Sequence, residues 1–324
     1  MDRILKRRAF LAGIAGGALL ALPRSARTED DASRKHTYTY KTVGDCEIKA
    51  DVYDAARGAV RPVVIWIHGG ALIMGNRGGM DGVLRAKLID AGYTVVSVDY
   101  RLAPETKLPE ILEDLQDACR WVREKGPELF HADAGRIAVM GASAGGYLTL
   151  ASGFRVDPRP LALVSLWGYG DVAGPWYSRP DPFYRTRPLV PKEEADQAVG
   201  GAILSDDSGK KNRGRFYLYC RQQGLWPKEV AGHDPDTEPR AFDPFCPIRN
   251  VSRQYPPTLL VHGTNDTDVP YAQSEDMDRA LARQGVDHEL ITVTGGAHGL
   301  AGSKPETISK IHGRILEFLH KYMR

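Results

Sequence analysis

The sequence predicts an α/β fold, in which a doubly wound, mostly parallel sheet carries helices on both faces. Over most of the 324 residues, short apolar runs alternate with amphipathic segments, as is typical of parallel strands joined by helices. Two runs of alternating polarity, separated by Gly44 and Asp45, precede them and predict an antiparallel hairpin. With 42% hydrophobic and 26% charged residues, the chain is long enough for one large domain with an insertion or for two small domains.

Eight runs are expected to form the strands of the sheet. The hairpin comprises Thr37–Val43 and Glu47–Tyr53. The six later runs are almost continuously hydrophobic, which suits parallel strands buried on both faces. They are Pro62–Ile67, Tyr93–Val98, Arg136–Met140, Leu161–Leu166, Thr258–Val261 and Glu289–Val293.

Five segments between or after these runs have helical character. Pro109–Lys125 shows it most clearly, because its apolar residues recur at the spacing of one helix face. The other four segments are Met80–Ala91, Gly145–Phe154, Tyr271–Gln284 and Ile308–Met323.

The alternation of strands and helices is interrupted from residue 168 to residue 255. This segment is rich in aromatic residues and prolines, and a structureless loop of that length is improbable inside a compact domain. We therefore expect a partly helical insertion between strands six and seven that covers one edge of the sheet like a lid or cap. Packing within the insertion accounts for most of its aromatic side chains, and we expect only two or three to contact a bound small molecule.

Residues 1–27 have the features of an export signal, which leaves 36–324 as the folded domain. Arg7 and Arg8 are followed by an apolar run, Ala9–Leu22, of 14 residues. As a helix this run would reach about 21 Å, short of the roughly 30 Å hydrocarbon core of a bilayer, so no stable membrane span is expected. The paired arginines resemble a bacterial twin-arginine signal. This resemblance implies a transient encounter with the twin-arginine export machinery and a periplasmic or secreted protein.

Charge and cysteine content exclude other classes of function. The net charge of +2 becomes −2 without residues 1–26, because 38 basic and 40 acidic residues remain; no nucleic-acid partner is expected. The four cysteines lie far apart without a C-x-x-C spacing, so no metal site is predicted. Cys119 is expected to be a buried free thiol, and a disulfide between Cys220 and Cys246 is left open.

Gly141–Gly145 is the stretch that points most directly to chemistry. It reads G-x-S-x-G between an apolar β-prone run and a helical segment, which is the context of a nucleophile elbow. The glycines allow the tight turn, and Ser143 is then presented near the positive end of the following helix.

A serine nucleophile needs a base, an acid that orients the base, and donors for the oxyanion. Among the nine histidines, His298 follows the last strand in a glycine-rich loop and is the expected base. Asp266, at the carboxyl end of the preceding strand, is the expected acid; Asp268 is the competitor, and we expect it to cap the turn or the next helix.

The donors to the oxyanion are expected from two segments that meet at the same edge of the sheet. Gly69 and Gly70 follow the strand Pro62–Ile67, and their amides can join that of Ala144.

The pattern of these residues in the chain resembles that of the α/β-hydrolase superfamily, and within it that of the carboxylesterases related to hormone-sensitive lipase. The stretches that carry the resemblance are Ile67–Ala71, Asp99–Glu105, Gly141–Gly146, His262–Pro270 and Ala297–Gly299. Ala71 stands where the H-G-G-G motif of that family has its third glycine. The extra mass between strands six and seven is similar to that of secreted feruloyl- and acetyl-esterase-like hydrolases. The resemblance implies an α/β-hydrolase fold and ester hydrolysis without a cofactor.

The sequence thus predicts an exported serine esterase that acts on a small-molecule carboxylic ester with a short acyl or aryl group, including esters on carbohydrates. One alternative is an aminopeptidase of the prolyl-oligopeptidase type, which has the same order of Ser143, Asp266 and His298. The other is a binding protein with a hydrolase fold, although such proteins generally lose one of the three catalytic residues, and Ser143, Asp266 and His298 are all present here.

Overall fold

The computed structural model describes residues 34–54, 59–208 and 212–324. The export signal predicted over residues 1–27 lies outside these described residues. Among the described residues, no helix has both the length and the apolar character that crossing a membrane requires.

The predicted eight-stranded, mostly parallel sheet is confirmed. Its strands follow the order β1-β2-β4-β3-β5-β6-β7-β8. The first two form the expected antiparallel hairpin, β2 is also antiparallel to β4, and the remaining neighbours are parallel. The bounds are β1 Arg34–Val43, β2 Cys46–Asp54, β3 Arg61–Ile67, β4 Thr94–Val98, β5 Ala132–Ala142, β6 Ala162–Leu166, β7 Thr258–Gly263 and β8 His288–Val293.

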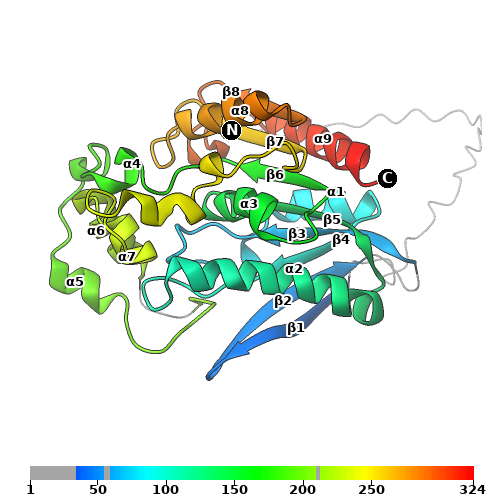
Figure 1. Cartoon of the computed structure of the whole chain (residues 1–324), viewed down its shortest axis with the longest axis horizontal. Coiled ribbons are helices and arrows are strands. Elements are labelled where there is room, and N and C mark those ends of the chain that lie inside the picture. Colours follow the sequence, from blue (N-terminus) through cyan, green and yellow to red (C-terminus); the bar gives the residue numbers. More distant parts are fainter. Residues whose placement is uncertain (1–33, 55–58, 209–211) are drawn as a thin grey trace, which may run out of the picture. The chain divides into compact units, whose positions relative to one another are not determined.

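Helices cover both faces of this sheet (Figure 1). Most buried apolar side chains of α2 (Leu108–Phe130), α3 (Ala144–Arg155) and α8 (Ala272–Gln284) belong to one hydrophobic cluster. Those of α1 (Gly82–Asp90) and α9 (Pro305–Tyr322) belong to a second cluster on the opposite face. The chain therefore forms three layers, with the sheet in the middle.

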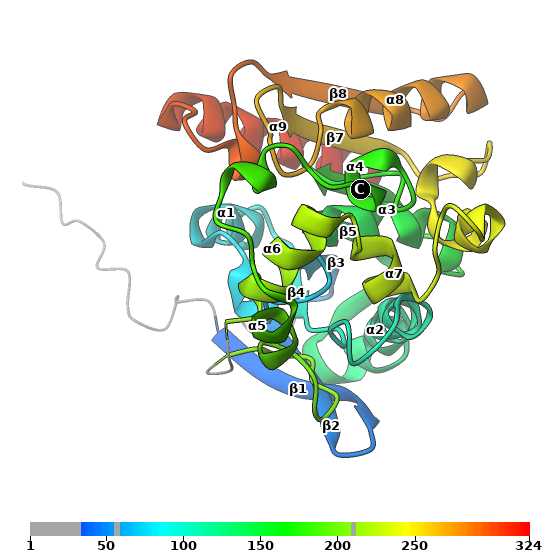
Figure 2. The same cartoon turned by 90° about the vertical axis from the view of Figure 1, so that its left-hand side faces the viewer.

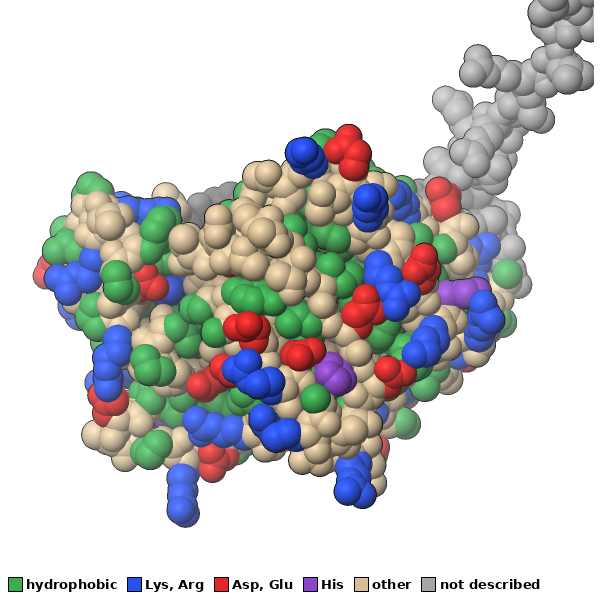
Figure 3. Space-filling model, turned by 90° about the horizontal axis from the view of Figure 1, so that it is seen from above, with side chains coloured by type: hydrophobic (Ala, Val, Ile, Leu, Met, Phe, Trp, Pro, Cys, Tyr) green, Lys and Arg blue, Asp and Glu red, His purple; other side chains and the backbone are tan. Residues whose placement is uncertain are grey.

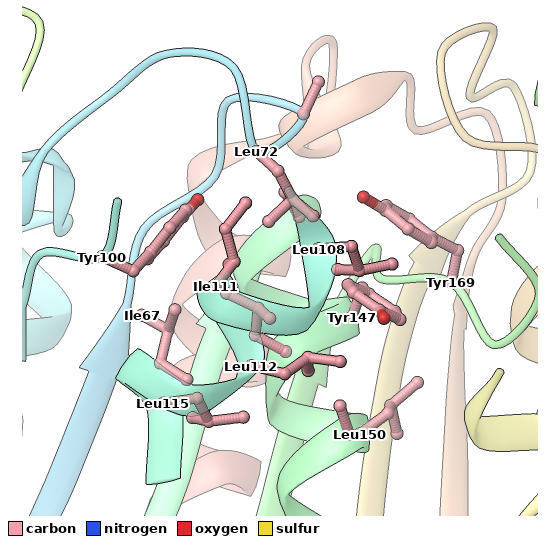
Figure 4. Close-up of a cluster of buried hydrophobic side chains, with 14 of the residues drawn as sticks. Ile67, Leu72, Tyr100, Leu108, Ile111, Leu112, Leu115, Tyr147, Leu150 and Tyr169 are labelled. Atoms are coloured by element: carbon pink, nitrogen blue, oxygen red, sulfur yellow. The ribbon is translucent and has the colours of Figure 1, made fainter. Parts of the chain in front are cut away.

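Strand β3 shows how the sequence builds both cores. Val63, Ile65 and Ile67 lie in the first cluster, whereas Val64 and Trp66 lie in the second. Successive side chains of a strand point to opposite faces, so a continuous apolar run is what a strand between two helical layers requires. Figure 4 shows part of the first cluster, in which side chains of α2 and α3 lie beside Ile67 at the end of β3 and beside residues of the segments that follow β3, β4 and β6.

The structure extends one predicted helix and settles the state of the cysteines. Helix α2 continues past Lys125 to Phe130 with Pro127 inside it, and it ends at His131 in the left-handed conformation (φ 54°). Cys220 and Cys246 are both buried and free, so the disulfide left open by the sequence is not formed. Cys119 is a buried free thiol, as expected.

Residues between β6 and β7 form the predicted insertion, and its described part contains four short α-helices. Figures 1 and 2 show these helices grouped beyond one end of the sheet. They are α4 Pro175–Ser178, α5 Lys192–Gln197, α6 Gly214–Gln223 and α7 Trp226–Ala231. Most of the aromatic side chains pack on one another, as expected: Tyr177 stacks on Trp226 with the ring centroids 4.2 Å apart, and both side chains are buried.

Charged side chains of both signs are interspersed on the face shown in Figure 3, without a large area of one sign. In the part of the chain that the structure describes, no group of three His, Cys, Asp or Glu side chains is arranged to hold a metal ion.

Candidate active site

Ser143 lies at a sharp turn between β5 and α3. Its backbone has φ 55° and ψ −119°, a conformation that costs a non-glycine residue of the order of 1–3 kcal/mol and is concentrated at functional sites. The flanking glycines are sterically required, because a Cβ on Gly141 would lie 2.4 Å from the carbonyl oxygen of Gly145. A Cβ on Gly145 would lie 2.0 Å from the carbonyl oxygen of Ile67. The strand–turn–helix context expected of a nucleophile elbow is therefore present.

Ala144 is the first residue of helix α3. An amide at this position has no acceptor within its own helix and lies at the positive end of the helix dipole. It is therefore suited to the predicted role as an oxyanion donor.

The turn that follows β3 lies directly beside this serine. A Cβ added to Gly69 would be 3.2 Å from the Cβ of Ser143, and one added to Gly70 would be 2.0 Å from the carbonyl oxygen of Met74. Gly70 also has φ +109°, which L side chains rarely adopt. The structure thus brings Gly69 next to Ser143 and requires glycine at position 70, whereas the oxyanion role of their amides stays a prediction.

His68 supports this turn through its side chain, a role in addition to the one expected of the glycine backbone that follows it. Its Nδ1 lies 2.7 Å from the carbonyl oxygen of Gly69, and its ring stacks on Tyr100 with the centroids 4.2 Å apart. Burial lowers the pKa of His68 to about 4, so the ring is neutral at neutral pH and its Nδ1–H donates to Gly69. The signal was present in the sequence as a histidine directly before the two glycines.

Asp266 and His298 are brought into direct contact. The Nδ1 of His298 lies 2.8 Å from the Oδ2 of Asp266, although 32 residues separate them in the chain. The Oδ1 of Asp266 accepts the backbone amides of Asp268 and Val269, both at 2.9 Å. Despite burial, which raises it, the pKa of Asp266 is lowered by hydrogen bonds from His262 and His298 and by the charge of His298. Asp266 is therefore a carboxylate oriented to hold the imidazole.

A second histidine, His262, contacts the same carboxylate. It is fully buried, and its Nε2 lies 3.3 Å from the Oδ2 of Asp266 and 3.0 Å from the carbonyl oxygen of Val269. Its Nδ1 lies 2.7 Å from the Oγ of Ser274. His262 was passed over in the sequence because a glycine follows it, yet its i, i+4 spacing to Asp266 was the signal for this contact.

The expectation for Asp268 is wrong. Helix α8 begins at Ala272, and its N-cap residue Tyr271 makes no side-chain cap; the two turn amides are accepted by Asp266 instead. Asp268 accepts hydrogen bonds from residues of the insertion, and its Oδ2 lies 3.3 Å from the Nε2 of His298. Within the described chain no hydrogen bond joins His298 to Ser143; such catalytic contacts often form only once substrate is bound.

A cavity of about 240 Å³ is lined by chain neighbours of two of these residues, whereas Ser143, Asp266 and His298 do not themselves line it. Ala142 and Gly299, the chain neighbours of Ser143 and His298, line one part of it. Trp167 also lines it and presents an edge to His298, with the ring centroids 6.5 Å apart. Its other walls are mainly leucine and isoleucine side chains, including those of α1 and α9, so the cavity suits a small apolar group.

Comparison with known proteins adds a family and several relatives. A family model described as the alpha/beta hydrolase fold matches residues 64–302, a range that includes Ser143, Asp266 and His298. The esterase LipC of Mycobacterium tuberculosis is 28% identical over 244 residues, which cover 74% of this chain and 53% of that protein.

Two further similarities differ in how much of each protein they cover. A non-reducing polyketide synthase of Penicillium brevicompactum is 29% identical over 304 residues, covering 78% of this chain but only 14% of the synthase. The chain therefore spans about one seventh of that relative. An arylesterase of known structure superposes with a TM-score of 0.63 at 24% identity, covering 90% of this chain and 85% of the arylesterase. The resemblance to the esterases seen in the sequence is confirmed.

Proposed function

Because the chain belongs to the alpha/beta hydrolase-fold family, we propose that it is a serine esterase that cleaves carboxylic esters through an acyl-enzyme on Ser143. The observation that carries this proposal is the 2.8 Å contact between His298 Nδ1 and Asp266 Oδ2, on loops at the sheet edge where the strained turn at Ser143 lies. A serine at an elbow together with an imidazole held by a carboxylate is the arrangement that acyl transfer requires.

In the first half of the reaction, the Oγ of Ser143 attacks the carbonyl carbon of the ester. The Nε2 of His298 takes the serine proton, and Asp266 stabilises the imidazolium that results. The carbonyl oxygen becomes an oxyanion, for which the amides of Gly69, Gly70 and Ala144 are the proposed donors. When the C–O bond to the alcohol breaks, the imidazolium returns the proton to the departing oxygen.

In the second half, water repeats these steps on the acyl-enzyme. His298 removes a proton from water, the resulting hydroxide attacks the acyl carbon, and the oxyanion forms again at the same donors. Collapse of this intermediate releases the carboxylic acid and returns the proton to the Oγ of Ser143.

Short acyl and aryl esters, including esters carried on carbohydrates, are the proposed substrates. The similarity to an arylesterase is in keeping with this proposal.

Replacement of Ser143 tests the proposal. We expect Ser143→Ala to lower kcat/KM for p-nitrophenyl acetate by about 10³-fold or more, because the nucleophile is lost. Ser152→Ala is a matched control: Ser152 lies on the same helix and donates to the carbonyl oxygen of Thr149. Near-normal turnover by Ser143→Ala, with the control also active, would contradict the proposal.

Two further measurements on the wild-type protein distinguish the two alternatives. Faster hydrolysis of aminoacyl anilides than of acyl esters by the wild-type protein would indicate an aminopeptidase. A wild-type protein whose Ser143 fails to react with a fluorophosphonate would indicate a binding protein.

A further inference from the structure

Two carboxylates face the imidazole of His298, one at each ring nitrogen. The Oδ2 of Asp266 lies 2.8 Å from Nδ1, and the Oδ2 of Asp268 lies 3.3 Å from Nε2. Both acids are on the loop that follows β7. A serine–histidine–carboxylate mechanism needs only the first of them, so the second requires an explanation.

The protonation state of the ring decides whether the second contact is favourable. Nδ1 donates its proton to Asp266, so a neutral ring presents a lone pair at Nε2, opposite another acceptor on Asp268. After Nε2 takes up a proton, the same 3.3 Å separation becomes an attraction between an imidazolium N–H and a carboxylate. The position of Asp268 therefore favours the protonated ring.

The insertion fixes the direction of this carboxylate. The other oxygen of Asp268, Oδ1, accepts from Tyr184 Oη at 2.7 Å, from Arg221 Nη1 at 2.9 Å and from Tyr217 Oη. With Oδ1 engaged by three donors of the insertion, Oδ2 is left to face His298.

Arg221, on α6, anchors this arrangement. Its side chain is only 1% exposed, and its Nη2 lies 2.5 Å from the Oδ2 of Asp181. The guanidinium also lies over the rings of Trp176 and Tyr177, 5.5 and 5.0 Å from their centroids. Figure 2 shows α6 in front of the sheet, within the group of insertion helices. Arg221 and Asp268 thus join the insertion to the catalytic loop.

We propose that Asp268 is a positioning residue through which the insertion holds the imidazole of His298 and favours its protonated form. The proposal rests on the proposed function, in which neutral His298 is the base. In the free enzyme, Asp268 stabilises the imidazolium that forms when Nε2 of His298 takes up a proton from solvent. A protonated His298 cannot accept the proton of Ser143. During acylation the same carboxylate stabilises the imidazolium until its N–H turns to the leaving oxygen.

The charged groups around the ring support this direction. Asp266 and Asp268 face it from the loop after β7, Arg221 faces it from α6, and Trp167 adds an uncharged edge. Burial lowers the pKa of His298, but the hydrogen bond to Asp266 and the charges of Asp268 and Asp266 outweigh it, against a smaller opposing effect of Arg221, so the pKa is raised.

The groups around Asp268 keep their charge states. Burial first, and then the negative charge of Asp268, raise the pKa values of Tyr184 and Tyr217, so both hydroxyls remain donors. The acids and the tyrosines around Arg221 raise its pKa despite burial. His298 is therefore the group at this junction whose change of protonation the pH dependence should report.

The pH dependence of kcat/KM for p-nitrophenyl acetate tests the proposal. Activity rises with pH as His298 loses its proton, so Asp268→Asn, which lowers the pKa of His298, should move this acid limb to lower pH by about one unit. Asp236→Asn is the matched control, because Asp236 also pairs with an arginine of the insertion, Arg179, at an exposed site. The control limb should coincide with that of the wild type.

Titration of the His298 ring by NMR gives a second readout that does not need activity. A lowered pKa of His298 in Asp268→Asn supports the proposal, and if no ester is cleaved the proposed function alone fails. An unchanged acid limb and an unchanged ring titration in folded Asp268→Asn would overturn the proposal.

A triple variant covers the case in which Asp268→Asn does not fold. Asp268→Asn with Arg221→Met and Asp181→Asn removes the guanidinium together with both carboxylates that pair with it, so none of the three charges is left without its partner. Its acid limb should also move to lower pH, by less than one unit, because the opposing charge of Arg221 is lost as well. A limb at or above the wild-type position would contradict the proposal.

Discussion

Both oxygens of Asp266 have fixed partners, and this makes the residue sensitive to an isosteric change. Oδ1 accepts the amides of Asp268 and Val269, while Oδ2 accepts from His298 and lies near His262. An asparagine at this position would keep its only carbonyl oxygen on the two amides. Its NH₂ group would then face Nδ1 of His298.

We therefore expect Asp266→Asn to reverse the tautomer of His298. With Nδ1 forced to accept and the proton on Nε2, the ring cannot take the proton of Ser143. The expected loss in kcat is on the order of 10⁴-fold, with little change in thermal stability. Asp276→Asn, an exposed change on α8, is the control. Wild-type kcat in Asp266→Asn would show that the carboxylate does not orient the base.

At the scale of elements, the insertion is attached to the core by buried ion pairs. Besides Arg221 and Asp268, Arg213 pairs with Glu105 at 2.7 and 2.8 Å, and both side chains are 3% exposed. Arg213 also donates to the carbonyl oxygen of Ile73, in the segment that follows Gly69 and Gly70. The insertion thus contacts the loops after β3, β4 and β7, which surround the site.

Removing one partner of this buried pair should be costly. We expect Arg213→Met to lower the free energy of unfolding by about 3–5 kcal/mol, because the carboxylate of Glu105 would remain buried without its counter-charge. Arg215→Met is the matched control two residues away; Arg215 pairs with Glu194 at the surface, so its loss should cost about 1 kcal/mol or less. Urea denaturation compares the two. Equal effects would show that burial of the Arg213 pair adds nothing.

At the scale of the whole molecule, the fold collects residues from distant parts of the sequence at one edge of the sheet. Gly69 follows β3, Ser143 follows β5, Asp266 follows β7 and His298 follows β8. The carboxyl ends of parallel strands share one edge, so the strand order alone brings these loops together.

The same principle explains what the sequence could predict. Strands such as β3 and β5 are buried on both faces, so their apolar runs were visible, and the residues that follow them could be placed together. The contact between Asp266 and His298 was predictable because each residue lies in a loop that directly follows a recognisable strand.

The contacts of Asp268 were not predictable in this way. Its partners Tyr184, Tyr217 and Arg221 come from the insertion, where no regular pattern places one residue against another. Local sequence favoured a turn cap for Asp268, and tertiary contacts with the buried Arg221 overrode that preference. The contact between His262 and Asp266 was not predicted for another reason: the glycine after His262 favoured a role for the backbone there.

The most direct test of the central claim is to trap the acyl-enzyme and locate the acyl group. Wild-type protein is mixed with p-nitrophenyl acetate, quenched in acid during turnover, digested and examined by mass spectrometry. We expect one acetyl group on the peptide that contains Ser143, and none on that peptide in Ser143→Ala. An acetyl-enzyme formed at another residue during productive turnover, with Ser143 unmodified, would contradict this claim.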